Sequence, residues 1–555
     1  MELTVVGEIP VWAAGSLYRT GPGQAKVEGT PAGTHHISHW FDGLAHSHRF
    51  EIEPGPDGGR VRVVYSSRRQ SEQLVKHLQS RGGARGMSFG QRRDPCVGFL
   101  AKFMSTFMAV VGKHVRPPRP RALENVCVTV LPDMPGLHAP ADGAADNSPG
   151  GRPPANVYLA TDTTMLKRID PVSLEPIGVT TQVALHPELT GPVSCSHAQR
   201  DPDTGDIFNF NLEFSRVATY RIFRVDAATG QTEILATMQR PDVRPAYVHS
   251  FFLTRNYVVL CLPCSHYSWG GAKMLWEKNV IDAIEPFDPS RLCRWFVFDR
   301  RGRGLVAELE SDAAFFFHTV NAFEEEKTDD GDSPEEDGTA RISIVCDLIE
   351  YLNFDIVRSL YYDALLDQDG AAGRLMADPE KVTTVIPRLT RYRLTFPASA
   401  ATQAVPPSQP ATPVAALRAE KILAIRGPHA GELPTINPAY STRKHRYVYS
   451  LPTRGLSTLV DTIAKTDTHT GEALLWDNPR GHTPGEAIFV ARPGAADEDD
   501  GVLLSVVLDG VEADSYLLCL DARTMKEVGR AEVGFALPLG FHGIMHPQVG
   551  DGARE

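Results

Sequence analysis

The chain has 555 residues, of which 42% are hydrophobic, and a formal net charge of −12. The apolar fraction is enough for a large core, and the length suits either several domains or one large barrel or propeller. The negative charge argues against a general nucleic-acid binder, because phosphate contact requires a basic surface.

The amino-terminal stretch MELTVVGEIPVW lacks the basic and apolar regions of a secretory signal. The longest apolar stretch, FLAKFMSTFMAVV, is too short to cross a bilayer. Eight cysteines are scattered along the chain, and only Cys261 and Cys264 form a C-x-x-C pair. We therefore expect a reduced, cytoplasmic protein.

The first notable segment is THHISHWFDGLAHSH, the densest histidine cluster of the chain, with His35, His36, His39, His46 and His48. It attracts attention as a metal site, but it has no acidic or cysteine ligand set at a regular spacing. Asp42 and Gly43 mark a tight turn inside it. We interpret this cluster as structural rather than metal-binding.

The next segment, residues 96–121, is expected to be a helix with one aromatic face. At helical spacing it aligns Phe99, Phe103 and Phe107, and basic residues flank the run. This pattern is typical of a helix that lies in a membrane interface. A second contact is expected from WGGAKMLWEK at 269–278, with Trp269 and Trp276. The alternative is an ordinary helix that caps the fold.

Strand signals dominate the rest of the chain, in short β-branched or aromatic runs such as NVYLAT, NYVVLCL and SYLLCLD. Five segments repeat one plan, in which a strand ends in Asp and a polar turn leads to another strand. The aspartates are Asp170, Asp226, Asp299, Asp467 and Asp521. Each Asp side chain is expected to cap backbone N–H groups of its turn. Five such hairpins predict a radial repeat such as a β-propeller, although single Asp hairpins occur in any β protein.

Four segments have compositions that cannot bury apolar surface and are expected to be surface loops. They are the insertions 141–154, 324–337 and 397–413 and the acidic stretch 496–501. The stretch CLPCSH has no second C-x-x-C, so a structural zinc site there is disfavoured.

Four further histidines are dispersed, and each lies at or beside a strand-like run: His197, His249, His318 and His542. A single histidine of this kind is usually a satisfied core residue. In a propeller, however, the innermost strands face one axis, so one histidine from each of four blades could converge there. Four neutral imidazoles suit a borderline metal, and ferrous iron would keep open positions for O2 and a substrate. Such ligands need an acceptor for their second ring nitrogen, commonly a carboxylate.

The chain resembles the carotenoid cleavage oxygenase family, which includes stilbene-cleaving oxygenases and a retinoid isomerase. The matching blocks run nearly end to end: GSLYRTGPG, HWFDGLAHSHRF, FGQRRDPC, LATDTTMLKRIDPVSLEP, ELPTINP, GEAIFVARPGAADEDDGVLLSVVLD and LPLGFHG. The resemblance implies one domain over residues 1–555. Its expected fold is an all-β, seven-bladed β-propeller with helices and loops capping one face.

The resemblance also implies an iron(II), Fe(2+), on the axis, held by His197, His249, His318 and His542. Three carboxylates would orient these ligands, and the matching positions are Asp162, Glu432 and Glu486. Several family members carry Glu where this chain has Asp162, so the side chain is one methylene shorter. Either the strand lies closer to its histidine, or a water bridges the gap.

The implied reaction is cleavage of a C=C double bond of a carotenoid or apocarotenoid with O2, giving carbonyl products such as retinal or an apocarotenal. A protein of this kind would bind a membrane surface peripherally. Stilbene-cleaving members carry a Lys just before the first carboxylate, whereas this chain has Thr161, which disfavours a stilbene substrate. Isomerisation of a retinoid ester and a catalytically silent scaffold stay open as further alternatives.

Overall fold

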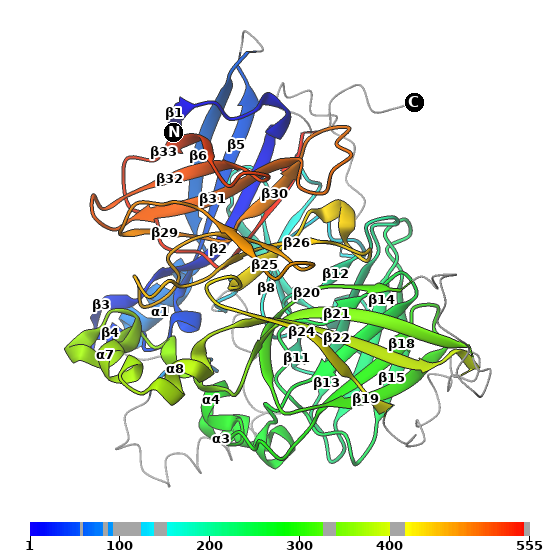
Figure 1. Ribbon diagram of the computed structural model, residues 1–555. Helices are drawn as coiled ribbons and strands as arrows, with labels where there is room; N and C mark the ends of the chain where they lie inside the picture. Colours follow the sequence, from blue (N-terminus) through cyan, green and yellow to red (C-terminus); the bar gives the residue numbers. More distant parts are fainter. Residues whose placement is uncertain are drawn as a thin grey trace.

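The computed structural model describes residues 1–55, 59–81, 87–92, 124–137, 153–325, 340–399 and 417–548. In this part of the chain, strands predominate and form sheets arranged around a common centre (Figure 1). The prediction of an all-β propeller is confirmed. The predicted insertions 141–154, 324–337 and 397–413 lie almost entirely outside the described residues.

Five sheets have four or five strands each, which is the size of one propeller blade. The first contains β7 (Thr129–Pro132), β8 (Val157–Ala160), β9 (Met165–Ile169) and β10 (Pro176–Thr181). The second contains β11 (Val193–Ser194), β12 (Gln199–Arg200), β13 (Ile207–Glu213), β14 (Thr219–Val225) and β15 (Thr232–Gln239). The third contains β16 (Phe252–Leu253), β17 (Tyr257–Leu262), β18 (Cys293–Asp299), β19 (Gly304–Ser311) and β23 (Leu417–Arg418). The fourth contains β20 (Phe315–Glu324), β21 (Arg341–Tyr351), β22 (Arg388–Pro397) and β24 (Glu420–Arg426), and the fifth β25 (Glu432–Thr435), β26 (Tyr447–Leu451), β27 (Ala464–Asp467) and β28 (Ala473–Leu475).

The sixth sheet has ten strands. They are β29 (His482–Pro484), β30 (Ile488–Ala491), β31 (Gly501–Asp509), β32 (Asp514–Asp521), β33 (Glu527–Glu532), β1 (Glu2–Gly7), β6 (Val61–Arg69), β5 (Leu44–Pro54), β2 (Gly15–Gln24) and β34 (His542–Pro547). The predicted count of seven separate blades is wrong, since the described strands form five separate blades and this continuous sheet. The cause is β1, because residues 4–7 pair with β33 whereas residues 2–3 pair with β6. A hairpin of β3 (Lys26–Thr30) and β4 (Gly33–His36) stands apart.

The five predicted Asp turns are confirmed. In each, an Asp carboxylate oxygen accepts a hydrogen bond from a backbone N–H two or three residues later, at 2.7–3.1 Å. The aspartates are Asp170, Asp226, Asp299, Asp467 and Asp521. Each turn therefore satisfies its own backbone donors and needs no help from a neighbouring blade.

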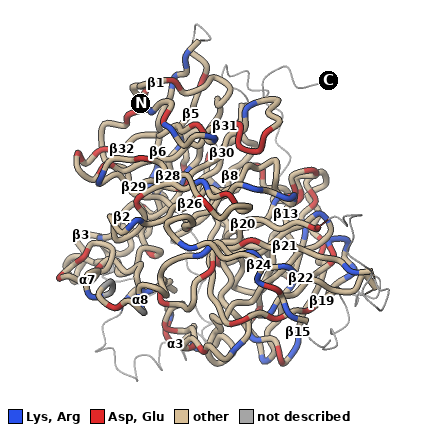
Figure 2. The backbone as a smooth tube through the Cα atoms, viewed as in Figure 1, with Lys and Arg blue, Asp and Glu red and all other residues tan. Residues whose placement is uncertain are grey.

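The strands between the turns are buried because each blade packs against its neighbours. All six residues of β17 are buried, as expected for a strand covered on both faces of its sheet. The N- and C-terminal strands meet in β2 and β34, where Thr20 pairs with His542. Charged residues of both signs are interspersed over the outer strands and loops (Figure 2).

Short helices gather along one side of the propeller (Figure 1). The α-helices are α1 (Glu72–Arg81), α3 (Ala272–Glu277), α4 (Val280–Ala283), α5 (Asp355–Ser359), α6 (Tyr362–Leu365), α7 (Ala371–Met376) and α8 (Pro379–Val385). The 3-10 helices are η1 (Val11–Ala13), η2 (Trp40–Asp42), η5 (Gln182–Ala184), η6 (Ser268–Gly271), η7 (Gln368–Gly370) and η8 (Pro438–Tyr440). The backbone N–H of Trp40 donates to the carbonyl of Leu360 at 3.0 Å, which ties η2 to the segment between α5 and α6.

Candidate metal centre

The four dispersed histidines converge, although four different sheets carry them. His197 lies between β11 and β12, His249 precedes β16, His318 is in β20, and His542 begins β34. Their nitrogen atoms all lie within 4.8 Å of one another. This convergence requires only that each sheet turns one innermost segment toward the same centre.

The nitrogen atoms of this cluster have the arrangement of a metal-binding donor set. The Nε2 atoms of His197 and His249 are 3.2 Å apart, and so are those of His318 and His542. Three of the rings donate through Nδ1 to a carboxylate, so their Nε2 atoms carry lone pairs that point into the cluster. Lone pairs at this separation repel one another unless a cation lies between them. The residues present therefore fit a divalent metal.

The protonation of the imidazoles supports the same role. Burial lowers the pKa of His197 well below its ordinary value, and the neighbouring imidazoles lower it further. Burial also lowers the pKa of His542, although Glu486 acts in the opposite direction. A neutral imidazole is the form that binds metal.

Three buried carboxylates hold three of the rings. Asp162 Oδ2 accepts from His249 Nδ1 at 2.8 Å, Glu432 Oε2 from His318 Nδ1 at 2.5 Å, and Glu486 Oε1 from His542 Nδ1 at 2.8 Å. Burial on its own raises the pKa of each carboxyl, but its histidine and its other donors outweigh burial and bring the pKa below the ordinary value. The three groups therefore stay ionised and fix the orientation of their rings.

The contact of Asp162 is direct. The distance of 2.8 Å from Asp162 Oδ2 to His249 Nδ1 is that of a hydrogen bond with no bridging water. The second oxygen of Asp162 accepts from the backbone N–H of Ser196 at 3.2 Å. The missing methylene therefore weakens neither contact.

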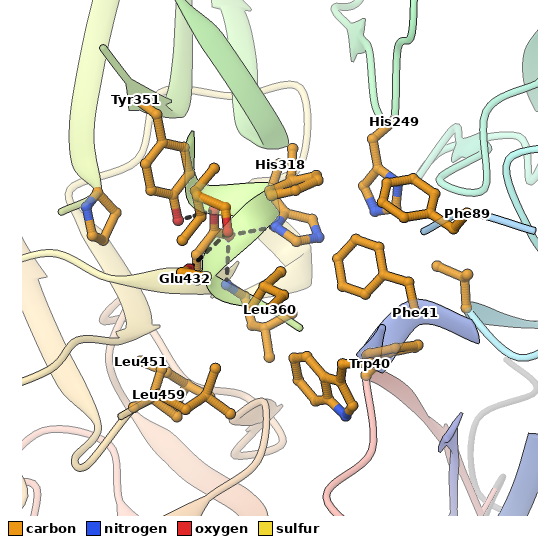
Figure 3. Close-up of a pocket in the computed structure, with 18 of the residues that line it drawn as sticks. Trp40, Phe41, Phe89, His249, His318, Tyr351, Leu360, Glu432, Leu451 and Leu459 are labelled. Atoms are coloured by element: carbon orange, nitrogen blue, oxygen red, sulfur yellow. Dashed lines mark hydrogen bonds and ion pairs between the residues drawn. The ribbon is translucent and has the colours of Figure 1, made fainter. Parts of the chain in front are cut away.

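Sequence reasoning missed two tyrosines behind the carboxylates. The hydroxyl of Tyr247 donates to Asp162 at 2.7 Å, and that of Tyr351 donates to Glu432 at 2.7 Å (Figure 3). Glu486 has a different partner, the backbone N–H of Gly543 at 2.7 Å. Tyr247 could have been found as a phenol two residues before a ligand candidate, whereas Tyr351 reaches the site only through strand pairing.

A cavity of about 650 Å³ lies beside the cluster and includes His249, His318 and His542 in its wall. One wall is aromatic and centres on Phe41, whose ring lies 4.8 Å from Phe89 and 5.5 Å from Phe317. Leucines such as Leu360, Leu451 and Leu459 line another part (Figure 3). Its size and apolar walls suit a hydrophobic small molecule.

Two charged side chains of the cavity wall, Asp42 and Arg454, already have partners among the described residues. The two carboxylate oxygens of Asp42 accept from the backbone N–H groups of Phe89 and Gly90 at 2.6 and 2.7 Å. Arg454 donates to Asp461 at 2.9 Å. Thr161, the position before the first carboxylate, also lies in the wall.

The amino-terminal histidines occupy different environments. His35 and His36 lie on the β3–β4 hairpin, and the rings of His46 and His48 contact each other at 4.3 Å. His39 is fully buried, with Nε2 2.8 Å from the carbonyl of Val357 and Nδ1 accepting from the backbone of Phe41. Within the described residues, the only group of three or more potential ligands close enough to share a metal is the dispersed set.

The C-x-x-C segment contributes to packing. Cys261 and Cys264 are buried free thiols, and the Sγ atom of Cys264 lies 3.9 Å from that of Cys293. His266 is buried beside them, and its Nδ1 atom has no hydrogen-bond partner in the described part of the chain.

The segment predicted to form a second membrane contact, residues 269–278, borders the cavity through Met274. Trp269 is 65% exposed and adopts a left-handed backbone conformation, with φ of 55°. Met274 and Met87 line the cavity, and the side chain of Met87 is 51% exposed. Phe99, Phe103 and Phe107 lie outside the described residues. None of the described helices has the length and apolar composition needed to cross a bilayer.

Comparison with known proteins gives a consistent picture. A family profile described as retinal pigment epithelial membrane protein matches residues 1–547. The chain is 50% identical to a carotenoid dioxygenase of Neurospora crassa, over 99% of this chain and 89% of the relative. It is also 50% identical to a torulene dioxygenase of Gibberella fujikuroi, over 99% and 91% of the two chains. A solved structure of cobalt-substituted Synechocystis apocarotenoid oxygenase superimposes with a TM-score of 0.67 at 22% identity, over 99% and 95% of the two chains.

Proposed function

The chain belongs to the retinal pigment epithelial membrane protein family and is an oxygenase; from this premise we propose that it is an iron(II) dioxygenase. It would cleave one C=C bond of a carotenoid or apocarotenoid with O2 and release carbonyl products such as retinal or an apocarotenal. The observation that carries the proposal is the convergence of four imidazoles beside a large apolar cavity, three of them in its wall.

When held by the four imidazoles, ferrous iron supplies the centre that activates O2 toward an alkene. The protein contributes position and environment. The carboxylate–histidine pairs keep the Nε2 atoms of His249, His318 and His542 aimed at the centre. The aromatic wall around Phe41 confines a flat polyene beside it. The apolar lining excludes water from the reacting bond. No side chain is required to donate or remove a proton.

The cavity lining supports a polyene rather than a hydroxystilbene. Thr161 is short and uncharged, so it cannot pair with a phenolate as a Lys ammonium does. Arg454, the cation of the wall, is held by Asp461. A carotenoid has no ionised group that needs a partner, and the names of the relatives agree with that substrate class.

The direct test is aerobic incubation of iron-loaded protein with carotenoids, apocarotenoids and stilbenes, with the products identified by mass spectrometry. We expect about one iron per chain and carbonyl products from the polyenes. A kcat/KM that favours a resveratrol-like stilbene by tenfold or more would overturn the substrate class and leave the metal proposal intact.

We also propose that the protein docks on a membrane surface through the segment around η6 and α3. Trp269 and Leu275 are 65% and 46% exposed, and this segment borders the cavity through Met274. An apolar substrate could then enter without crossing water. Trp269→Glu with Leu275→Glu should shift the protein from liposome-bound to free in a flotation assay. The matched control is Val511→Glu, which alters an equally exposed apolar side chain on the β31–β32 turn.

A further inference from the structure

The hydroxyl group of Tyr267, in the cavity wall, has no hydrogen-bond partner among the described residues. Most polar groups of the wall are occupied: Asn125 donates to the carbonyl of Gly43 at 2.8 Å, Ser88 to that of Lys278 at 3.1 Å, and Thr458 to that of Leu365 at 2.6 Å. The phenol of Tyr267 forms no hydrogen bond to any described residue, although the side chain is only 1% exposed. Within the part of the chain that the structure describes, it is therefore an unpaired polar group in the interior.

The Tyr267 hydroxyl is not fully enclosed by protein atoms. It is not among the fully enclosed polar atoms that lack a partner in the described chain, unlike Nδ1 of His266. Its backbone N–H bonds to the carbonyl of Pro245 at 2.9 Å, and its ring packs at 5.2 Å from Phe214. The backbone and the ring of Tyr267 are thus both held in place. The open space beside the residue is the cavity that it lines.

Tyr267 lies on the side of the metal centre that carries His249. The residue precedes η6, and the cavity wall continues from it into Met274 and Val280. Residues 265–267 pair with residues 245–247, the segment that leads to His249. Burial raises the pKa of the Tyr267 phenol, and the Asp162 carboxylate raises it further. The phenol is therefore protonated at neutral pH and acts as a hydrogen-bond donor.

A donor in this place discriminates between ligands. A hydrocarbon that fills the cavity would leave the hydroxyl desolvated and unpaired, which costs free energy. A carbonyl or hydroxyl oxygen on the ligand would remove that cost. Sites built to bond a polar group reject analogues that lack it much more strongly than apolar pockets reject size variants.

We propose that Tyr267 is a specificity residue whose hydroxyl donates to an oxygen atom at one end of the polyene, so that the enzyme selects an oxygen-bearing polyene and binds it in one direction. This rests on the proposed function as a polyene-cleaving oxygenase. The substrate class is an apocarotenal or another carotenoid with a carbonyl or hydroxyl end group, oriented with its oxygen on the side of α3 and α4.

The test compares Tyr267→Phe with the wild type on an apocarotenal and on a hydrocarbon carotene, both delivered in the same detergent. One neutral hydrogen bond predicts a fall in kcat/KM of about 5–10-fold for the apocarotenal, mostly in KM, and at most about twofold for the hydrocarbon. The matched control is Tyr257→Phe, since Tyr257 is equally buried, packs against Phe396 and lies outside the cavity wall. It should match the wild type on both substrates.

An equal change on both substrates, or none on the apocarotenal, would overturn the role of Tyr267. Anaerobic binding measured by tryptophan fluorescence gives a second readout that does not depend on turnover, and the ratio of the two Kd values should shift by the same factor. If the wild type cleaves neither polyene, the proposed function fails, whereas the Kd ratio still decides whether Tyr267 recognises oxygen.

Discussion

The two sets of histidines in this molecule differ in how their spacing along the chain relates to their positions in the fold. The amino-terminal set is dense in sequence, yet its rings are spread between a hairpin, a buried loop and a strand. The dispersed set stretches from His197 to His542, yet its nitrogen atoms lie within 4.8 Å of one another. Density along the chain therefore says little about a metal centre, because neighbouring residues in a strand point to opposite faces. What matters is which segments the fold returns to the axis.

The partners of the rings differ in the same way. His39 bonds only to backbone groups, at Val357 and Phe41, which satisfies a neutral ring and leaves no nitrogen free. In the dispersed set, carboxylates hold Nδ1 and leave Nε2 unshared. The first arrangement is that of a buried structural residue. The second leaves a nitrogen lone pair available to bind a metal. The predictions below test this contrast, from the largest expected free-energy effect to the smallest.

Removing a ligand should have the largest effect. Alanine at His197, His249, His318 or His542 should abolish iron binding and reduce turnover by on the order of 10³-fold or more, well beyond the effect of losing an outer hydrogen bond. Iron per chain by mass spectrometry and turnover check this. His36→Ala and His46→Ala are the controls, and both should keep the iron. Two ligand variants that retained iron and turnover would refute the metal site.

The buried His39 should act on stability instead. Burial lowers its pKa to about 4, while the unfolded chain keeps the ordinary value near 6.5. Between these values the unfolded state binds a proton that the native state does not, so stability falls as pH drops from about 6.5 to 4, by about 3 kcal/mol in all.

Urea unfolding at several pH values measures this dependence. His39→Gln should flatten the profile across that window, whereas replacement of the exposed His36 should leave it parallel to the wild type. If the profile of His39→Gln ran parallel to that of the wild type, protonation of His39 would not contribute to the pH dependence of stability.

Neutralising an outer carboxylate should have an intermediate effect. Glu432→Gln, Glu486→Gln and Asp162→Asn should each weaken iron affinity or activity by roughly 10–100-fold, because each removes the charged acceptor of an Nδ1 proton. Asp162 belongs in the same range as the glutamates, since its contact is as short. Glu308→Gln, in a buried ion pair with Arg240, is the matched control for loss of a buried carboxylate. Inert Glu432 and Glu486 variants would contradict their role.

Lengthening Asp162 should have the smallest effect of the series. Several family members carry Glu at this position, but here the direct 2.8 Å contact leaves no gap for another methylene. Inserting one should press on His249 and cost about tenfold in iron affinity, as overpacking of a buried site does. Iron titration of the variant decides this, and unchanged affinity would mean that the strand retreats to make room.

The prediction of the fold succeeded where local chemistry dictates structure. The five Asp turns and the strands between them follow from side chains that cap their own turns and from short β-branched runs. Local chemistry did not predict the number of separate blades. The strand β1 pairs with β33 on one edge and with β6 on the other, and so merges ten strands into one sheet. Strand pairing between distant segments leaves no mark in local composition.

The sequence by itself determined the chemistry available to this protein: four imidazoles beside strands, three carboxylates in matching blocks, and enough apolar surface for a propeller. Only the tertiary structure decided how these groups meet. It brings Asp162 directly onto His249 and places Tyr247 and Tyr351 behind the carboxylates. It also leaves the hydroxyl of Tyr267, in the cavity wall, without a partner among the described residues. The physical reason is that a hydrogen bond depends on tenths of an ångström between segments that are far apart in the chain, and packing of whole blades sets those distances.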